Sequence, residues 1–107
     1  MKTLKFANNL PKLILKGEKN ITWRLNDDKN LNIGDEISLL RAESKEEFAK
    51  AIILSVKETT FGELTEEDWK GHEKFQSNEE MYRTYSKYYS IDVNSKTKLK
   101  IINFKLK

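Results

Sequence analysis

The spacing of apolar and polar residues predicts strands along most of this chain. Near the C-terminus apolar and polar side chains alternate, so that Ile102, Phe104 and Leu106 would share one face of a strand. Shorter apolar runs, bounded by turn-forming residues, predict further strands upstream. The predicted strands cover residues 3–6, 21–25, 36–41, 48–56 and 97–106.

Capping signals predict three helices between these strands. Residues 8–11 are suited to begin the first helix, because Asn is a good N-cap and Pro is tolerated in the first turn. Gly17 would end that helix by taking a positive φ. Thr65 precedes a short acidic helix, and Ser77 begins a helix that reaches about Tyr89. Strands outnumber helices and form hairpins readily, so we expect an α+β fold, a small mixed β-barrel with helices packed on its side and rim.

Length and composition narrow the class of protein. The 107 residues fit one domain, residues 1–107. Cysteine is absent, which excludes disulfides, thiolate metal sites and cysteine nucleophiles. The 20 basic and 17 acidic residues give a net charge of +3, which is too small by itself to indicate a nucleic-acid binder. The N-terminal residues contain no long apolar run, so we expect no signal peptide, no membrane span and a cytoplasmic location.

Residues 17–24 are the strongest candidate for a functional site. Side chains alternate along a strand, so a strand from Ile21 onward places Ile21 and Trp23 in the core. The opposite face would carry a row of polar side chains, namely Asn20, Thr22 and Arg24. Arg24 can donate in a forked geometry to a phosphate or a base edge.

Lys19 joins this polar row on one condition. If the strand already includes Lys19, its side chain points to the other face. If residues 17–19 still belong to the turn after the helix, as Gly17 permits, Lys19 can face the same cleft. An ordinary edge strand with a surface lysine also fits these residue types, since exposed Lys and Arg are common.

A set of motifs in a fixed order extends over nearly the whole chain. After the first predicted helix these are Gly17-x-Lys19-x-x-Thr22-x-Arg24, Leu31-x-x-Gly34-Asp35-x-Ile37, Phe61-x-x-Leu64, Trp69 to Glu73, a helix ending Tyr88-Tyr89, and Ile102-x-Phe104-x-Leu106. In this order and spacing the sequence resembles the ASCH family, a branch of the PUA-like barrels. The resemblance implies an RNA-related role, as in most members of that family.

Some small stand-alone members of the ASCH family are amidohydrolases that remove the acetyl group from N(4)-acetylcytidine. Carried over to this chain, the resemblance makes Lys19, Thr22 and Glu73 the catalytic residues, with the spacing near Glu73 tolerating a shift of one. A threonine hydroxyl is a poor nucleophile until a base takes its proton. A lysine buried beside Arg24 would have its pKa depressed by desolvation and like charge, as such a base requires.

The residues around Glu73 offer further candidates. Trp69 can stack on a base, or it can pin its loop to the barrel. His72 is the only histidine, so a transition-metal site would lack ligands, and we expect no metal and no other cofactor. His72 also leaves open a ribonuclease in which Lys19, Glu73 and His72 share the acid and base roles. One stripe at helical spacing is expected to be the packing face of the last helix, namely Met81, Tyr85 and Tyr88. Tyrosine hydroxyls at the edge of this stripe can also reach a ligand.

The sequence therefore favours a protein that binds RNA, a nucleoside or a nucleotide in a cleft at residues 17–24. The binding residues expected beside Lys19 and Thr22 are Arg24, Asn20, Trp69 and His72. The alternative is the N(4)-acetylcytidine amidohydrolase with a Lys/Thr/Glu site, and a ribonuclease ranks third. The expected partner is RNA or a modified nucleoside, with no membrane and no metal.

Overall fold

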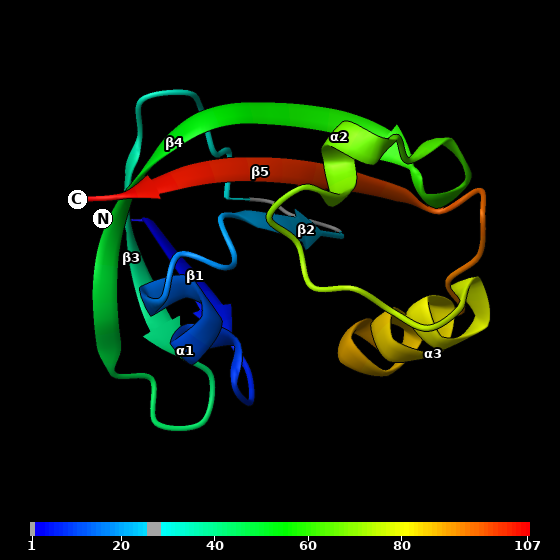
Figure 1. Cartoon of the computed structure of the whole chain (residues 1–107), viewed down its shortest axis with the longest axis horizontal. Helices are drawn as coiled ribbons and strands as arrows, with labels where there is room; N and C mark the ends of the chain where they lie inside the picture. The colour runs from blue at the N-terminus through cyan, green and yellow to red at the C-terminus, as the bar shows by residue number, and fades with distance from the viewer. Residues whose placement is uncertain (1, 26–28) are drawn as a thin grey trace.

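A five-stranded mixed sheet forms the framework of the protein in a computed structural model that describes residues 2–25 and 29–107. The strands lie in the order β1 (Lys2–Phe6), β3 (Glu36–Arg41), β4 (Glu47–Thr60), β5 (Lys98–Leu106) and β2 (Ile21–Arg24). β1 pairs with β3 in parallel, and the other neighbours are antiparallel. The long strands β4 and β5 arch across the molecule, and the sheet curls into a half-barrel (Figure 1). The α+β prediction of a mixed barrel-like sheet is confirmed.

β4 is longer than the sequence pattern predicted. It continues beyond Val56 to Thr60, because it keeps pairing with β5 through Glu58 opposite Lys100 and Thr60 opposite Lys98. This extension is mostly polar and carries no apolar alternation, so periodicity did not mark it as strand. Register shifts in the ladder, one between β3 and β4 and one between β4 and β5, accompany the bend of the sheet.

The three helices among the described residues begin where the capping signals placed them. They are α1 (Leu10–Leu15), α2 (Glu66–Trp69) and α3 (Asn78–Tyr89). The Ser77 hydroxyl accepts a hydrogen bond from the Glu80 N–H at 3.1 Å, and the Asp68 carboxylate accepts one from the Thr65 N–H at 2.9 Å. Asn9 stands at the N-cap of α1, but its side chain makes no capping hydrogen bond.

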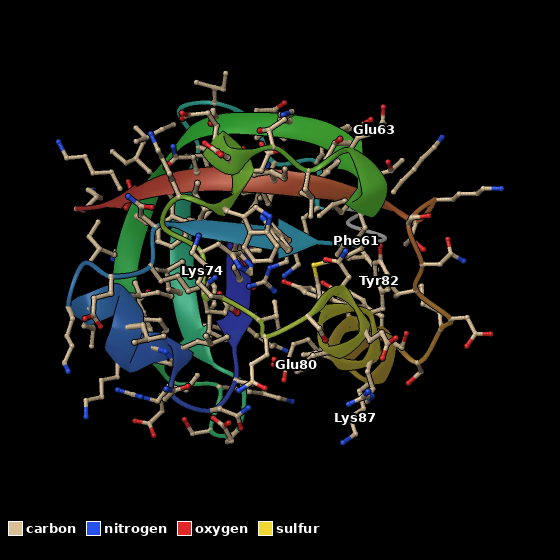
Figure 2. All side chains as sticks on the ribbon, turned by 45° about the vertical axis from the view of Figure 1, so that its right-hand side comes forward. Phe61, Glu63, Lys74, Glu80, Tyr82 and Lys87 are labelled. Carbon is tan, nitrogen blue, oxygen red and sulfur yellow. The ribbon has the colours of Figure 1, made fainter. Side chains whose placement is uncertain are left out.

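Two clusters of buried side chains fill the two ends of the half-barrel. The first lies between α1 and the strands β1, β3, β4 and β5. The second lies between β2, β5, the 3-10 turn η1 (Phe61–Glu63) and α3, and it contains Ile21 and Trp23, as the strand alternation predicted. Phe61 and Tyr82 meet edge to face on the side of α3 that faces the sheet, with ring centroids 5.9 Å apart (Figure 2).

The two terminal strands of the sheet, β1 and β2, are joined by a side chain. The Arg24 Nη2 at the end of β2 donates to the Lys5 carbonyl of β1 at 2.8 Å. The gap in the barrel wall is therefore bridged by a guanidinium, and backbone hydrogen bonds do not close it there. Among residues 2–25 and 29–107, no helix has the length and apolar character that crossing a membrane requires.

Candidate functional site

The turn between α1 and β2 buries Lys19. Gly17 has a φ of +81°, a conformation that glycine adopts without strain, and β2 begins only at Ile21. Residues 17–20 therefore belong to the turn, which is the condition that the sequence set for Lys19. Its side chain is 2% exposed, and Nζ donates to the Ile21 carbonyl at 2.7 Å and to Glu73 Oε1 at 2.5 Å.

The loop between α2 and α3 brings Glu73 to this lysine. The Gly71 carbonyl accepts hydrogen bonds from the N–H groups of Asn20 at 2.9 Å and Ile21 at 3.2 Å, which docks the loop against the start of β2. Gly71 has a φ of +78°, and a Cβ at this position would lie 1.7 Å from the Asn20 side-chain oxygen. A side chain there would be strained at this φ and would displace the Asn20 side chain, so Gly71 lets the loop that carries Glu73 pack closely on Asn20.

Thr22 and Arg24 lie on β2, which follows the turn that carries Lys19. Thr22 is 4% exposed, and its hydroxyl oxygen accepts a hydrogen bond from Arg24 Nε at 3.1 Å. The guanidinium lies over the Phe6 ring, 4.6 Å from its centroid. Arg24 therefore holds the Thr22 oxygen from one side, and the hydroxyl hydrogen stays available for another acceptor.

A pocket of about 240 Å³ opens at the seam between β1 and β2. It brings together four of the residues that the sequence selected, namely Lys19, Thr22, Arg24 and Glu73. The rest of its lining comes from β1 and the start of α1, from Trp23 and Ala42, and from Tyr85, Tyr88 and Tyr89 of α3. The described residues that line this pocket do not include Asn20, Trp69 or His72.

Burial and charge shift the pKa values of Lys19 and Glu73 in the pocket. Desolvation lowers the pKa of Lys19 from 10.5 to about 8; Glu73 opposes this shift, and the Arg24 charge adds to it. The lowered pKa matches the prediction for a lysine buried beside Arg24. For Glu73, burial acts to raise the pKa, but the charge of Lys19 and the hydrogen bond from Lys19 outweigh it and leave the pKa below its usual value.

Trp69 and His72 form an aromatic layer around Trp23 instead of lining the pocket. The His72 ring stacks on Trp23 with centroids 3.8 Å apart, and Trp69 meets Trp23 edge to face at 4.6 Å. Burial, with the Lys19 charge adding to it, lowers the pKa of His72 to about 3, so the ring is neutral at physiological pH. Trp69 thus pins its loop to the sheet, which is one of the two roles that the sequence left open.

Asn20 lies in the turn, where strand alternation does not apply. The sequence placed it in one row with Thr22 and Arg24, but β2 begins one residue later and the Asn20 side chain turns to Gly71. Tyr85 belongs to the stripe that the sequence assigned mainly to packing, with a contact between a tyrosine hydroxyl and a ligand left open. It is 4% exposed in the second cluster and also lines the pocket. No signal in the helical stripe separates these two roles.

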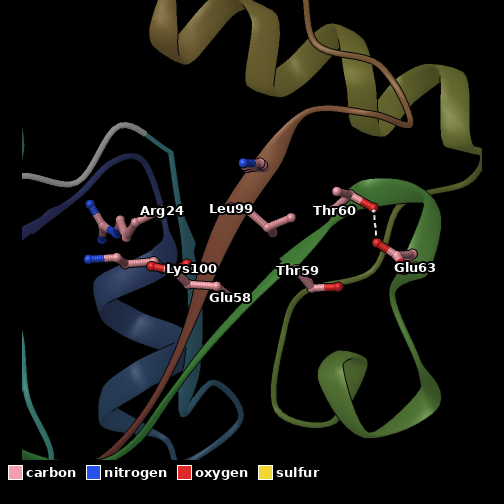
Figure 3. Close-up of a pocket in the computed structure, with 8 residues that line it drawn as sticks. Arg24, Glu58, Thr59, Thr60, Glu63, Leu99 and Lys100 are labelled. Carbon is pink, nitrogen blue, oxygen red and sulfur yellow. Dashed lines mark hydrogen bonds between the residues drawn. The ribbon is translucent and has the colours of Figure 1, made fainter.

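A second, more open pocket of about 370 Å³ lies on the far side of Arg24, between the ends of β4 and β5 (Figure 3). Thr60 donates a hydrogen bond to Glu63 across its rim at 2.8 Å. Its lining mixes acidic and basic side chains and includes none of Lys19, Thr22 and Glu73. We therefore take the seam pocket as the candidate site. In the part of the chain that the structure describes, no group of three or more Asp, Glu or His side chains is placed to hold a metal ion.

Solved structures share this fold. An ASCH domain from Lactobacillus crispatus is similar over 98% of this chain and 79% of that one, at 16% identity and a TM-score of 0.69. The hypothetical protein PH0355 is similar over the full length of both chains, at 23% identity and a TM-score of 0.75. The ASCH protein of Zymomonas mobilis is similar over 96% of this chain and 65% of that one, at 11% identity and a TM-score of 0.68.

The fold of this chain is therefore that of ASCH domains, as the sequence resemblance implied. The scan against protein-family models gave no match. The search of curated proteins gave none either.

Proposed function

We propose that the protein binds a nucleoside, free or within RNA, in the seam pocket of an ASCH-type domain. The observation that carries this proposal is the convergence of Lys19, Thr22, Arg24 and Glu73 on one pocket rimmed by tyrosines. The volume of about 240 Å³ lies just below the usual range for drug-sized ligands, which suits a single base with part of its sugar. The tyrosine rings provide faces on which a base can stack.

Calorimetric titration tests this binding. We expect cytidine or N(4)-acetylcytidine to bind the wild type, and Lys19→Met to weaken binding at least tenfold. Lys16→Met is the matched control, because Lys16 is an exposed lysine of the same turn and lies outside the pocket. Titration with a short single-stranded RNA at two salt concentrations separates a free nucleoside from a strand, since phosphate contacts make affinity fall with salt. The absence of binding by every nucleoside and by RNA at low salt would refute the proposal.

A second candidate function is hydrolysis of N(4)-acetylcytidine, and the lowered pKa of Lys19 favours it. With a pKa of about 8, roughly one Lys19 in ten is neutral at pH 7 and able to accept a proton. In this reaction Lys19 takes the hydroxyl proton of Thr22 as the oxygen attacks the acetyl carbon. The carbon–nitrogen bond then breaks, Lys19 returns the proton to the exocyclic nitrogen, and cytidine leaves. Water hydrolyses the threonine ester to acetate and restores Thr22.

The remaining groups have roles in the same reaction. Glu73 is ionised, because its pKa is lowered, and it can accept a hydrogen bond from the exocyclic N–H. His72 is neutral and outside the pocket, so a ribonuclease that uses it as an acid has less support.

Conversion of N(4)-acetylcytidine to cytidine and acetate, followed by chromatography, tests this second function. We expect Thr22→Val to abolish turnover, because the nucleophile is lost while the side-chain volume is kept. Thr59→Val is the control, since Thr59 lines the second pocket and not the seam pocket. Lack of turnover by the wild type, or full turnover by Thr22→Val, would rule out this mechanism.

A further inference from the structure

His72 is a buried titratable group that the proposed chemistry does not use. Its side chain is 0% exposed, and the ring stacks on Trp23, which lines the pocket, with 15° between the two ring planes. Nδ1 lies 2.8 Å from the Glu73 carbonyl oxygen and 3.3 Å from Glu73 Oε1, and Nε2 lies 3.1 Å from the Tyr85 hydroxyl. Tyr85 in turn lines the seam pocket.

The chemistry of these oxygens fixes the direction of both hydrogen bonds. A carbonyl can only accept, so Nδ1 carries the hydrogen and donates to Glu73. The His72 ring is neutral, since burial lowers its pKa to about 3, and Nε2 therefore carries no hydrogen. The Tyr85 hydroxyl must then donate to Nε2, and its single hydrogen is committed away from the pocket.

Burial also raises the pKa of Tyr85, so the phenol keeps its proton and does not become a phenolate. With its hydrogen held by His72, the Tyr85 oxygen can offer a ligand only lone pairs. The ionised Glu73 carboxylate likewise carries no hydrogen that it could donate to a ligand. At these two oxygens the pocket wall is therefore suited to N–H groups of a ligand, and neither oxygen can donate a hydrogen to a carbonyl.

We propose that Tyr85 is a specificity-determining residue that selects bases with an exocyclic amine over bases with a carbonyl in the same place, and that His72 is the positioning residue that fixes this preference. The inference rests on the proposed nucleoside function of the seam pocket. Cytosine presents an N4 amine where uracil presents an O4 carbonyl, so the ligand class is cytosine-like. A carbonyl facing two acceptors leaves buried polar groups unpaired, which is an effective way to reject a ligand.

The first test needs no ligand. The chain contains one histidine, so the imidazole nitrogen signals of a sample labelled with ¹⁵N-histidine belong to His72 alone. We expect the Nδ1–H tautomer, unchanged between pH 5 and pH 8. An Nε2–H tautomer, or titration of the ring within that range, would overturn the inference, because the Tyr85 hydroxyl would then be free to donate to a ligand.

The second test is the ratio of the Kd of uridine to the Kd of cytidine. We expect the wild type to prefer cytidine by about tenfold or more. Tyr85→Phe should reduce this ratio several-fold. His72→Phe, which keeps a ring on Trp23, should also reduce it, because the released Tyr85 hydroxyl can donate to O4 of uridine. Tyr82→Phe is the control, since Tyr82 packs on Phe61 and does not line the pocket.

A purely structural role for this pair would weaken both nucleosides alike and leave the ratio unchanged. An unchanged ratio in Tyr85→Phe and His72→Phe, with cytidine still bound by the wild type, overturns this inference and leaves the proposed function standing. A wild type that binds neither nucleoside nor RNA overturns the proposed function and the selectivity together.

Discussion

Two lysine–carboxylate pairs, Lys19 with Glu73 and Lys57 with Asp68, differ in which partner is buried. In the first, Lys19 is 2% exposed and Glu73 is 21% exposed, with Nζ and Oε1 2.5 Å apart. In the second, Lys57 is 50% exposed and Asp68 only 5%, with Nζ and Oδ1 3.0 Å apart. The two pairs have the same chemistry and opposite burial.

The difference decides what each pair can do. Burying the cation lowers the pKa of Lys19 to about 8 and produces a group that can exchange a proton near neutral pH. Burying the anion has another result: burial acts to raise the pKa of Asp68, but the Thr65 N–H and Lys57 outweigh it and lower the pKa. Asp68 therefore stays ionised and caps α2, which suits a structural role.

The largest expected contrast between the pairs is in turnover. If the seam pocket hydrolyses N(4)-acetylcytidine, Lys19→Met should lower kcat by about 10²- to 10⁴-fold, which is typical for loss of a positioned base. Lys57→Met should change kcat less than threefold, because Lys57 does not line the pocket. Steady-state kinetics on both variants, with circular dichroism to verify folding, measures the contrast. An equal loss of kcat in the two variants would mean that burial of the lysine does not determine its role in turnover.

The second contrast concerns stability against pH. The pKa of Lys19 is about 8 in the folded protein and 10.5 as the ordinary value, so between these pH values the unfolded chain binds more protons. Stability must then rise with pH in this window. Relative to Lys19→Met, the wild type should gain about 2 kcal/mol in free energy of unfolding between pH 7.5 and pH 9.5.

Urea unfolding at several pH values measures this gain, and subtracting the Lys19→Met curve removes the titration of other groups such as Tyr85. Lys57→Met, treated in the same way, is the control for replacing an ion-paired lysine. A wild-type gain that is absent or negative in the Lys19→Met difference would contradict the lowered pKa.

The third contrast comes from removing the carboxylates. Glu73→Ala leaves Lys19 buried without its partner, but the lysine can escape the penalty by losing its proton. Since its pKa of about 8 is only about one unit above pH 7, this escape limits the Lys19 part of the cost to about 1.4 kcal/mol, and the cost should fall further at pH 9.5. Asp68→Ala should cost about 1 kcal/mol at both pH values, because the lost cap on α2 does not titrate there. Urea unfolding of both variants at the two pH values decides the matter: a cost of Glu73→Ala that is independent of pH would contradict this account.

How much of the site could be predicted depends on the range of each contact. Residues 17–24 form a local segment. Gly17 was enough to indicate that Lys19 could lie in the turn, where the alternation of strand side chains does not apply. The start of the strand at Ile21 was predicted correctly, and Asn20 was misplaced because the strand alternation was extended one residue beyond that start, into the turn. Strand alternation placed Trp23 in the core correctly.

Contacts between residues that are far apart in the sequence could not be predicted from local patterns. Glu73 lies 54 residues from Lys19, and only the family resemblance suggested that the two meet. The second role of Tyr85 follows from how α3 lies against the seam, and a helical stripe gives no information on that. The polar end of β4 was missed because cross-strand pairing, which no local pattern records, holds it in the sheet.

The smallest expected contrast is in salt dependence, and it probes the difference in burial directly. Charges exposed to solvent are screened by salt, whereas buried charges are screened much less. The coupling energy of Lys57 with Asp68, from a double-mutant cycle, should be below about 1 kcal/mol and should fall between 0.05 M and 1 M NaCl. The coupling of Lys19 with Glu73 should change much less over the same range, because the Lys19 side chain is only 2% exposed. If both couplings fell in parallel, solvent would have access to Lys19. The burial that explains both its lowered pKa and its proposed role as a base would then be contradicted.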